Sequence, residues 1–230
     1  LKPGIVGKDD VDVAFEVAPP IKMPEFINGN PNAAGYLVAE PIGTKAIAGG
    51  IAEQQFLSSE LWENHPCCIV TFQQEIIDKY TEAVTEFTQL LVKAGKLISD
   101  KPGLAAEIAV NFLDPDKSLG LKTALLKNVL TDPQGITTDD LYPNIEDLEK
   151  IQNYMHDVMG VGNKINLREF VDLRFAQAAY GNDTSMQKKS VLHNDKETIF
   201  KILNKNIERA KENAAKALLN KEGKYLMFNL

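Results

Sequence analysis

Two short stretches of this 230-residue chain carry residue types that could bind or transform a small molecule. In the first, Glu40 comes directly after the apolar residues 36–39 and directly before Pro41. Because proline cannot donate to a strand ladder, this run is predicted to be a strand that ends at Glu40. Strand ends in open α/β sheets are where ligands bind, so Glu40 is a candidate acceptor for a ligand ammonium, hydroxyl or cation. A solvated carboxylate, or one that caps the next helix, is the alternative interpretation.

The second stretch is residues 65–68, in which His65 and a proline precede Cys67 and Cys68. Imidazole and thiolate are typical zinc and copper ligands, and a thiol beside a histidine can act as a nucleophile. A structural zinc site, however, has its cysteines two to four residues apart with a second pair elsewhere, and the two other histidines lie far away in the sequence. Cysteines in an apolar run are more often small core residues. No metal and no cofactor is therefore predicted.

The elements that would position these residues are short strands and helices. Alternation of apolar residues predicts a strand at 11–17, the apolar run at 36–39 predicts a second, and 52–58 is a possible third. Short helices are predicted between them at 23–28 and 43–50. The first two strands and their helix form a βαβ unit, so we expect them to be parallel. The β-branched run at 67–72 predicts a strand buried on both faces.

The rest of the chain is predicted to be mostly helical. Apolar residues recur with a 3.6-residue period over 74–98, and Pro102 suits the first position of a helix at 103–113. Asn144 and Asn166 are expected N-caps. Further helices are predicted at 119–130, 145–159, 167–180 and 197–219, with loops at 135–143 and 181–194.

Composition and charge exclude several classes of protein. The chain is 44% apolar and 25% charged, which is typical of a globular protein with one or two domains. Its net charge of −7 and its lack of a basic stripe argue against nucleic-acid binding. No apolar run approaches the ~20 residues that span a bilayer. Two adjacent cysteines cannot make a disulfide framework. Because the chain starts without a methionine or a signal segment, we expect processing or truncation at its start.

Three stretches together resemble a known family of transport proteins. They are APPIKM at 18–23, GYLVAEP at 35–41 and ELWENHP at 60–66. Their order and spacing are similar to those of the solute-binding proteins of ABC importers for nitrate, bicarbonate, sulfonates, taurine and thiamine precursors. The resemblance extends more weakly through 74–97 and 147–179.

The resemblance implies a periplasmic-binding-protein-like fold of type II, with two α/β lobes joined by a hinge around a ligand cleft. Residues 1–39 would end the second lobe, 40–43 would be the return crossing, and 44–180 would complete the first lobe, followed by a polar loop and a helix in 181–230. Roughly the first 100 residues of the family pattern, about one domain, would be absent. Implied ligand-binding positions are Pro19, Pro20, Glu40, His65, Cys67 and Cys68. The nitrate and bicarbonate branch has charged or polar residues where the two cysteines stand here. Two thiols suit a less polar or larger organic ligand, or a soft metal.

The function implied is capture of a small anion or organic molecule by hinge closure, without catalysis. The expected partners are the ligand and the permease subunits of an importer, and the expected protein is monomeric and binds no nucleic acid. It would act outside the cytoplasm, in the periplasm or as a lipoprotein on the outer face of the membrane. Two alternatives are an enzyme similar to thiamine-pyrimidine synthase and a cytoplasmic ligand-sensing domain of a transporter.

Overall fold

The computed structural model describes residues 16–181, 190–219 and 225–229, and the chain divides into two compact units. The first unit is Leu1–Phe56 with Ile207–Leu230, and the second is Leu57–Asn206. The predicted crossing at residues 40–43 lies inside the first unit, between a strand and a helix. The assignment of lobes made from the sequence stays a prediction. Mixed helices and strands agree with the predicted α/β class.

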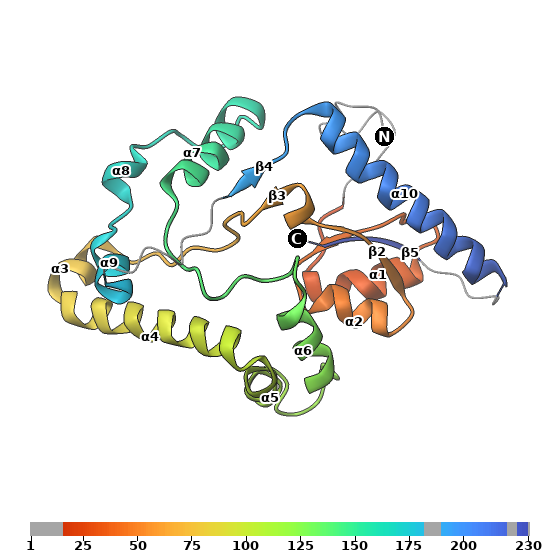
Figure 1. The fold of residues 1–230 in the computed structure, drawn as a ribbon, viewed down its shortest axis with the longest axis horizontal. Helices are drawn as coiled ribbons and strands as arrows, with labels where there is room; N and C mark the ends of the chain where they lie inside the picture. The colour runs from red at the N-terminus through yellow and green to blue at the C-terminus, as the bar shows by residue number, and fades with distance from the viewer. Residues whose placement is uncertain (1–15, 182–189, 220–224, 230) are drawn as a thin grey trace. The chain divides into compact units, whose positions relative to one another are not determined.

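The first unit has a three-stranded sheet with the order β1-β5-β2 (Figure 1). Its elements along the chain are η1 (Pro20–Lys22), α1 (Met23–Gly29), β1 (Leu37–Val38), α2 (Ile42–Ala48), β2 (Ala52–Leu57) and β5 (Tyr225–Asn229). The predicted helices at 23–28 and 43–50 and the strands at 36–39 and 52–58 are confirmed within a residue or two. Residues of α1, β1, α2 and β2, together with Tyr36 just before β1, form one apolar core, made of Ile27, Tyr36, Val38, Ala46 and Ala52.

Strand β1 is parallel to β5, with Leu37 opposite Phe228. Because β5 lies near the far end of the chain, the apolar pattern around β1 could not reveal this pairing. Most of the strand predicted at 11–17 lies outside the described residues, and Glu16 and Val17, which are described, are not in a strand.

Helix α10 (Lys196–Leu219) begins in the second unit and ends in the first. It confirms the helix predicted at 197–219. Within the first unit, the Arg209 guanidinium donates to the main-chain carbonyls of Gln54, at 3.2 Å, and Gln55. Because these carbonyls belong to β2, the contact fixes the helix against that strand.

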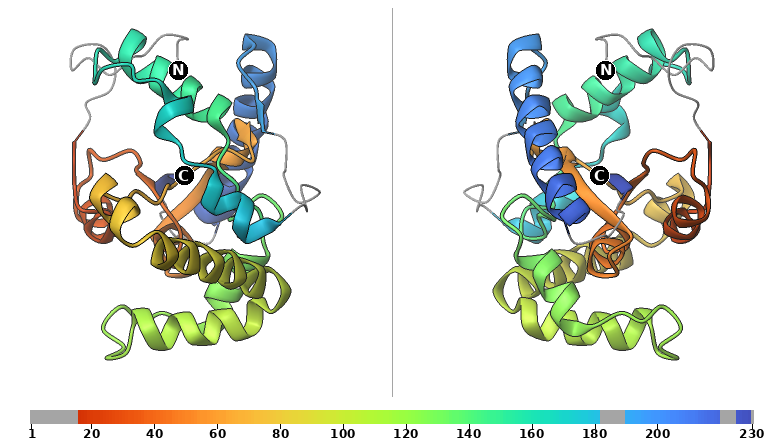
Figure 2. Two further views of the ribbon diagram at one scale, coloured as in Figure 1. Left: turned by 90° about the vertical axis from the view of Figure 1, so that its left-hand side faces the viewer. Right: turned by 90° about the vertical axis from the view of Figure 1, so that its right-hand side faces the viewer.

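The second unit contains α3 (Gln74–Lys79), α4 (Thr81–Asp100), α5 (Pro102–Leu113) and α6 (Thr123–Thr131). The single helix predicted at 74–98 is wrong, because Tyr80 leaves the helical region with φ −131° and ψ 42°. A one-residue break does not disturb an apolar period, so the sequence did not show it. Helix α5 packs against α4 and α6. It is seen end-on in Figure 1 and lengthwise in Figure 2, so it runs across α4.

A loop replaces the first turn of the helix predicted at 119–130. The Asp114 carboxylate accepts hydrogen bonds from the main-chain N–H groups of Leu119 and Leu121, each at 2.8 Å. These bonds hold residues 114–122 in a loop, and α6 starts only at Thr123. Asp114 is 3% exposed, so burial of the carboxylate requires such partners.

Helix α7 (Ile145–Asn153) continues as a π-helical turn, η3 (Tyr154–Val158). Both predicted caps are confirmed, since the side chains of Asn144 and Asn166 accept N–H bonds from the helices that follow them. The helix predicted at 167–180 is divided into α8 (Leu167–Phe170) and α9 (Arg174–Tyr180). Asp172 causes the division, because its carboxylate accepts from the Arg174 N–H and guanidinium and so starts a new helix.

A small second sheet joins β3 (Trp62–Glu63) to β4 (Val191–Leu192) in antiparallel register, after the short helix η2 (Ser58–Glu60). The buried strand predicted at 67–72 is wrong: these residues lie in neither helix nor strand, and Ile69 and Val70 are more than half exposed. A β-branched run forms a strand only where a neighbouring strand pairs with it. Here β4 pairs with the two residues of β3 instead.

Candidate ligand site

Glu40 lies where β1 gives way to α2, as the sequence predicted. Its carboxylate accepts a hydrogen bond from the Thr44 N–H at 3.0 Å, and the Glu40–Pro41 peptide bond is cis. Glu40 therefore caps the first turn of α2, which is the alternative interpretation of this residue. The side chain is half-buried, and this capping bond uses one carboxylate oxygen, Oε2.

Tyr36 is the residue near Glu40 that the sequence reading did not single out. Its side chain is 9% exposed, and its buried hydroxyl has no hydrogen-bond partner among the residues that the structure describes. Burial, and then the charge of Glu40, raise the pKa of Tyr36 to about 12. Because the Glu40 charge contributes to this pKa shift, the Tyr36 phenol lies close enough to the carboxylate to interact with it electrostatically. The only signal in the sequence was that a polar-tipped residue stands at an inward position of the strand that leads to Glu40.

Pro19 and Pro20 lie in the same unit as Glu40 but on the surface. Pro20 begins η1, and the Pro19 carbonyl accepts the Lys22 N–H at 2.8 Å, so both prolines shape the approach to α1. Both side chains are exposed. That they line a cleft together with Glu40 stays a prediction.

His65 belongs to the second unit, where it closes the turn after β3. Its Nδ1 lies 2.7 Å from the Trp62 carbonyl oxygen, and its Nε2 lies 3.1 Å from the Ser58 Oγ. A carbonyl can only accept, so Nδ1 donates to it, and Nε2 shares a hydrogen bond with the Ser58 hydroxyl. Both ring nitrogens are thus engaged within the turn. The Trp62 ring lies 5.9 Å from the imidazole, centroid to centroid.

Cys67 and Cys68 follow this turn as two free, exposed thiols, which corrects the expectation that they lie in a buried strand. Their Sγ atoms are 3.7 Å apart. Glu40 belongs to one compact unit and the cysteines to the other. Their predicted proximity therefore stays a prediction.

The buried residue Asp147, in α7, helps to hold the turn that contains Trp62 and His65. Asp147 is 1% exposed, and its Oδ1 accepts from Lys150 Nζ at 2.7 Å and from Ser190 Oγ at 2.6 Å. The Lys150 ammonium lies 5.7 Å from the centroid of the Trp62 ring. These contacts connect α7 with the segment before β4 and with β3. The sequence showed Asp147 only as part of the weak second resemblance.

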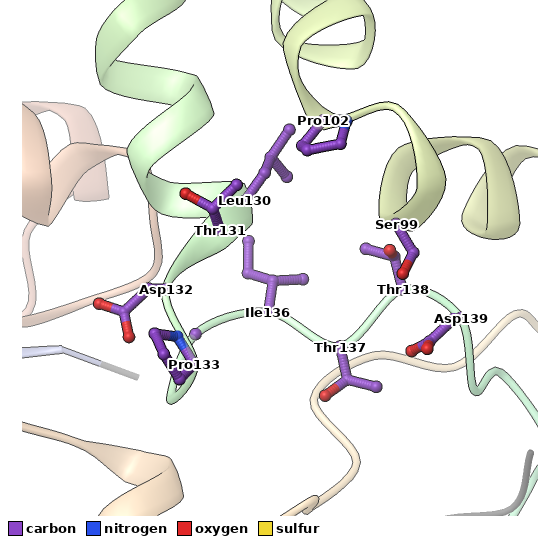
Figure 3. Close-up of a pocket in the computed structure, with 11 residues that line it drawn as sticks. Ser99, Pro102, Leu130, Thr131, Asp132, Pro133, Ile136, Thr137, Thr138 and Asp139 are labelled. Atoms are coloured by element: carbon purple, nitrogen blue, oxygen red, sulfur yellow. The ribbon is translucent and has the colours of Figure 1, made fainter.

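A surface pocket in the second unit lies between the loop at 132–139 and the ends of three helices (Figure 3). Its volume is about 360 Å³. In Figure 3, Ile136 points from the loop toward Leu130 at the end of α6. Hydroxyl groups and two carboxylates supply its polar lining: Ser99, Thr131, Asp132, Thr137, Thr138 and Asp139. None of the predicted site residues lines this pocket.

Within residues 16–181, 190–219 and 225–229, no group of three or more His, Cys, Asp or Glu side chains is arranged to hold a metal ion. The helices in these ranges include none long and apolar enough to cross a membrane.

Comparison with known families gives a match over the first part of the chain. Residues 1–112 match a family of periplasmic-binding-protein-like solute-binding proteins. This is the NMT1-like family. The matched segment contains all six predicted ligand-binding residues and ends within α5. Comparisons with curated proteins and with solved structures gave no match.

Proposed function

We propose that this protein is the solute-binding component of an ABC importer and that it binds its ligand without transforming it. The observation that carries the proposal is the match of residues 1–112 to the NMT1-like family, which implies solute binding in the broad sense. The ligand is a small anion or a small organic molecule such as a sulfonate, a carboxylate or a pyrimidine. The partners are the permease subunits, and the protein acts outside the cytoplasm.

Two features near Glu40 support this function. The carboxylate stands at a strand end, where α/β folds bind ligands, and its field reaches the buried Tyr36 hydroxyl. A hydroxyl that is buried without a partner is unfavourable, by about 1–3 kcal/mol, unless a further group satisfies it. A ligand that donates to the Glu40 carboxylate could at the same time exchange a hydrogen bond with the Tyr36 hydroxyl, once movement of the surrounding residues admits it.

A thermal-shift screen of the full chain tests the proposal. The panel contains inorganic anions, alkyl sulfonates, carboxylates and aminopyrimidines. A ligand present at about 100 times its Kd stabilises the folded protein by about 2.7 kcal/mol, which raises the melting temperature measurably. We expect one chemical class to raise it in a concentration-dependent manner. A panel in which no compound shifts the transition would overturn the proposal.

A further inference from the structure

Cys67 and Cys68 have a geometry that neither the turn before them nor the contacts proposed around Glu40 and Tyr36 use. In an extended chain, neighbouring side chains point to opposite faces. Here the two Sγ atoms are 3.7 Å apart, and Cys68 donates its S–H to Cys67. Both thiols are free and exposed, and they are the only cysteines of the chain. The backbone therefore presents two sulfur atoms to solvent on one side.

The separation of these sulfur atoms suits a shared metal ion. Tetrahedral coordination with metal–sulfur bonds of ~2.3 Å places two thiolates about 3.8 Å apart. The observed 3.7 Å meets this requirement without movement of the backbone. Thiolates select soft ions over hard ones, which prefer oxygen ligands.

We propose that Cys67 and Cys68 chelate one soft, thiophilic divalent cation through their two sulfur atoms. Each thiol releases its proton to solvent, two metal–sulfur bonds replace two metal–water bonds, and no atom is oxidised or reduced. Because no further donor group completes a metal site in the part of the chain that the structure describes, water keeps the remaining positions on the ion. The ion is therefore exchangeable rather than structural.

The protonation of the Cys67 thiol and the position of His65 both affect how this chelate forms. Partial desolvation of the Cys67 sulfur, and then its hydrogen bond with Cys68, raise the pKa of the Cys67 thiol, so binding of the ion must displace the Cys67 proton. His65 is two residues away, but both of its ring nitrogens are already engaged by Trp62 and Ser58. The chelate is thus expected to use sulfur alone.

Titration of the full chain with Cd²⁺, followed by the sulfur-to-cadmium absorbance band, tests this assignment. We expect one Cd²⁺ per chain, and at least about tenfold weaker binding in Cys67→Ser and in Cys68→Ser, because each loses the chelate. His156→Gln, which changes a histidine bonded to the Gly162 carbonyl, should bind Cd²⁺ as the native chain does. No absorbance band in the native chain, native affinity in either serine variant, or weakened binding in His156→Gln would overturn the proposal.

Phenylarsine oxide gives a second measurement that does not depend on absorbance. Its oxygen leaves as water with the two thiol protons, two arsenic–sulfur bonds form, and arsenic stays trivalent. We expect intact mass spectrometry to show one adduct on the native chain and none on either serine variant. Adducts on a single-cysteine variant, or none on the native chain, would show that the two thiols do not act as a pair.

Discussion

Gly95, in the middle of α4, lies directly against the main-chain carbonyl of Thr138. A Cβ atom on Gly95 would be 2.1 Å from that oxygen and 2.9 Å from the Leu141 Cδ1. The loop at 132–141 therefore packs on the helix backbone itself. Only glycine permits this approach, and the approach fixes one wall of the pocket in Figure 3.

We predict that Gly95→Ala destabilises the second unit by about 1–3 kcal/mol, because the loop must move away from α4. Without this contact, alanine in place of glycine would stabilise the helix by ~1 kcal/mol. Gly103→Ala in α5 is the matched control, since a Cβ there meets nothing within 4 Å. Urea denaturation followed by the fluorescence of Trp62, the only tryptophan, measures both. Equal stability of the two variants would refute the close contact.

Loss of the Tyr36 hydroxyl and loss of the Tyr180 hydroxyl are predicted to change the free energy of unfolding in opposite directions. Tyr36→Phe removes a buried, unpartnered hydroxyl and should stabilise the first unit by about 1–2 kcal/mol. Tyr180→Phe removes the acceptor of the Leu141 N–H at 2.7 Å and should destabilise the second unit by about 1–2 kcal/mol. Differential scanning calorimetry at neutral pH distinguishes them. The same sign for both variants would contradict the structure.

The raised pKa of Tyr36 also predicts a dependence of stability on alkaline pH. The group has a pKa of 10.0 ordinarily and about 12 in the folded protein, so the unfolded chain loses this proton first. Its contribution is complete below pH 10 and is lost as pH rises from about 10 to about 12. We expect the native chain to lose stability more steeply over this range than Tyr36→Phe does. Thermal melts of both proteins at increasing pH measure this difference. If their stability falls in parallel with pH, the raised pKa of Tyr36 is contradicted.

Two lysine–carboxylate pairs are predicted to differ because only one carboxylate is buried. Lys150→Met leaves Asp147, 1% exposed, with an uncompensated charge and should destabilise the protein by about 2 kcal/mol, since Ser190 still donates to it. Lys79→Met leaves Glu75, 67% exposed, in water and should change stability by less than ~0.5 kcal/mol. Urea midpoints measure both, and a larger loss in Lys79→Met would disprove the difference.

The sequence predicted most local structure of the first unit because its signals act over short distances. Glu40 and Pro41 followed the end of β1 and Gly29 closed α1, as the pattern predicted. In the second unit, Asn144 and Asn166 likewise capped their helices for local reasons. What failed depended on partners far along the chain. The run at 67–72 has strand composition, but a strand also needs a pairing neighbour, and among the described residues none pairs with this run.

The candidate site was predictable only in part for the same reason. Glu40 could be identified because a strand end is visible in sequence. Tyr36 could not, since an unpartnered hydroxyl is known only once the surrounding core is in place. The 3.7 Å approach of the two sulfur atoms likewise depends on the absence of a strand at 67–72, where neighbouring side chains would have diverged.

Calorimetric titration of the thermal-shift hit tests most directly whether this protein binds a solute at Glu40. Glu40→Gln keeps an acceptor for the Thr44 N–H and removes only the charge, and Glu25→Gln, in an exposed pair with Lys22, is the control. We predict one ligand per chain, binding weakened about tenfold or more in Glu40→Gln, equivalent to at least ~1.4 kcal/mol, and unchanged binding in Glu25→Gln. Equal affinity of the native chain and Glu40→Gln, or no heat of binding at all, would contradict a solute site at Glu40.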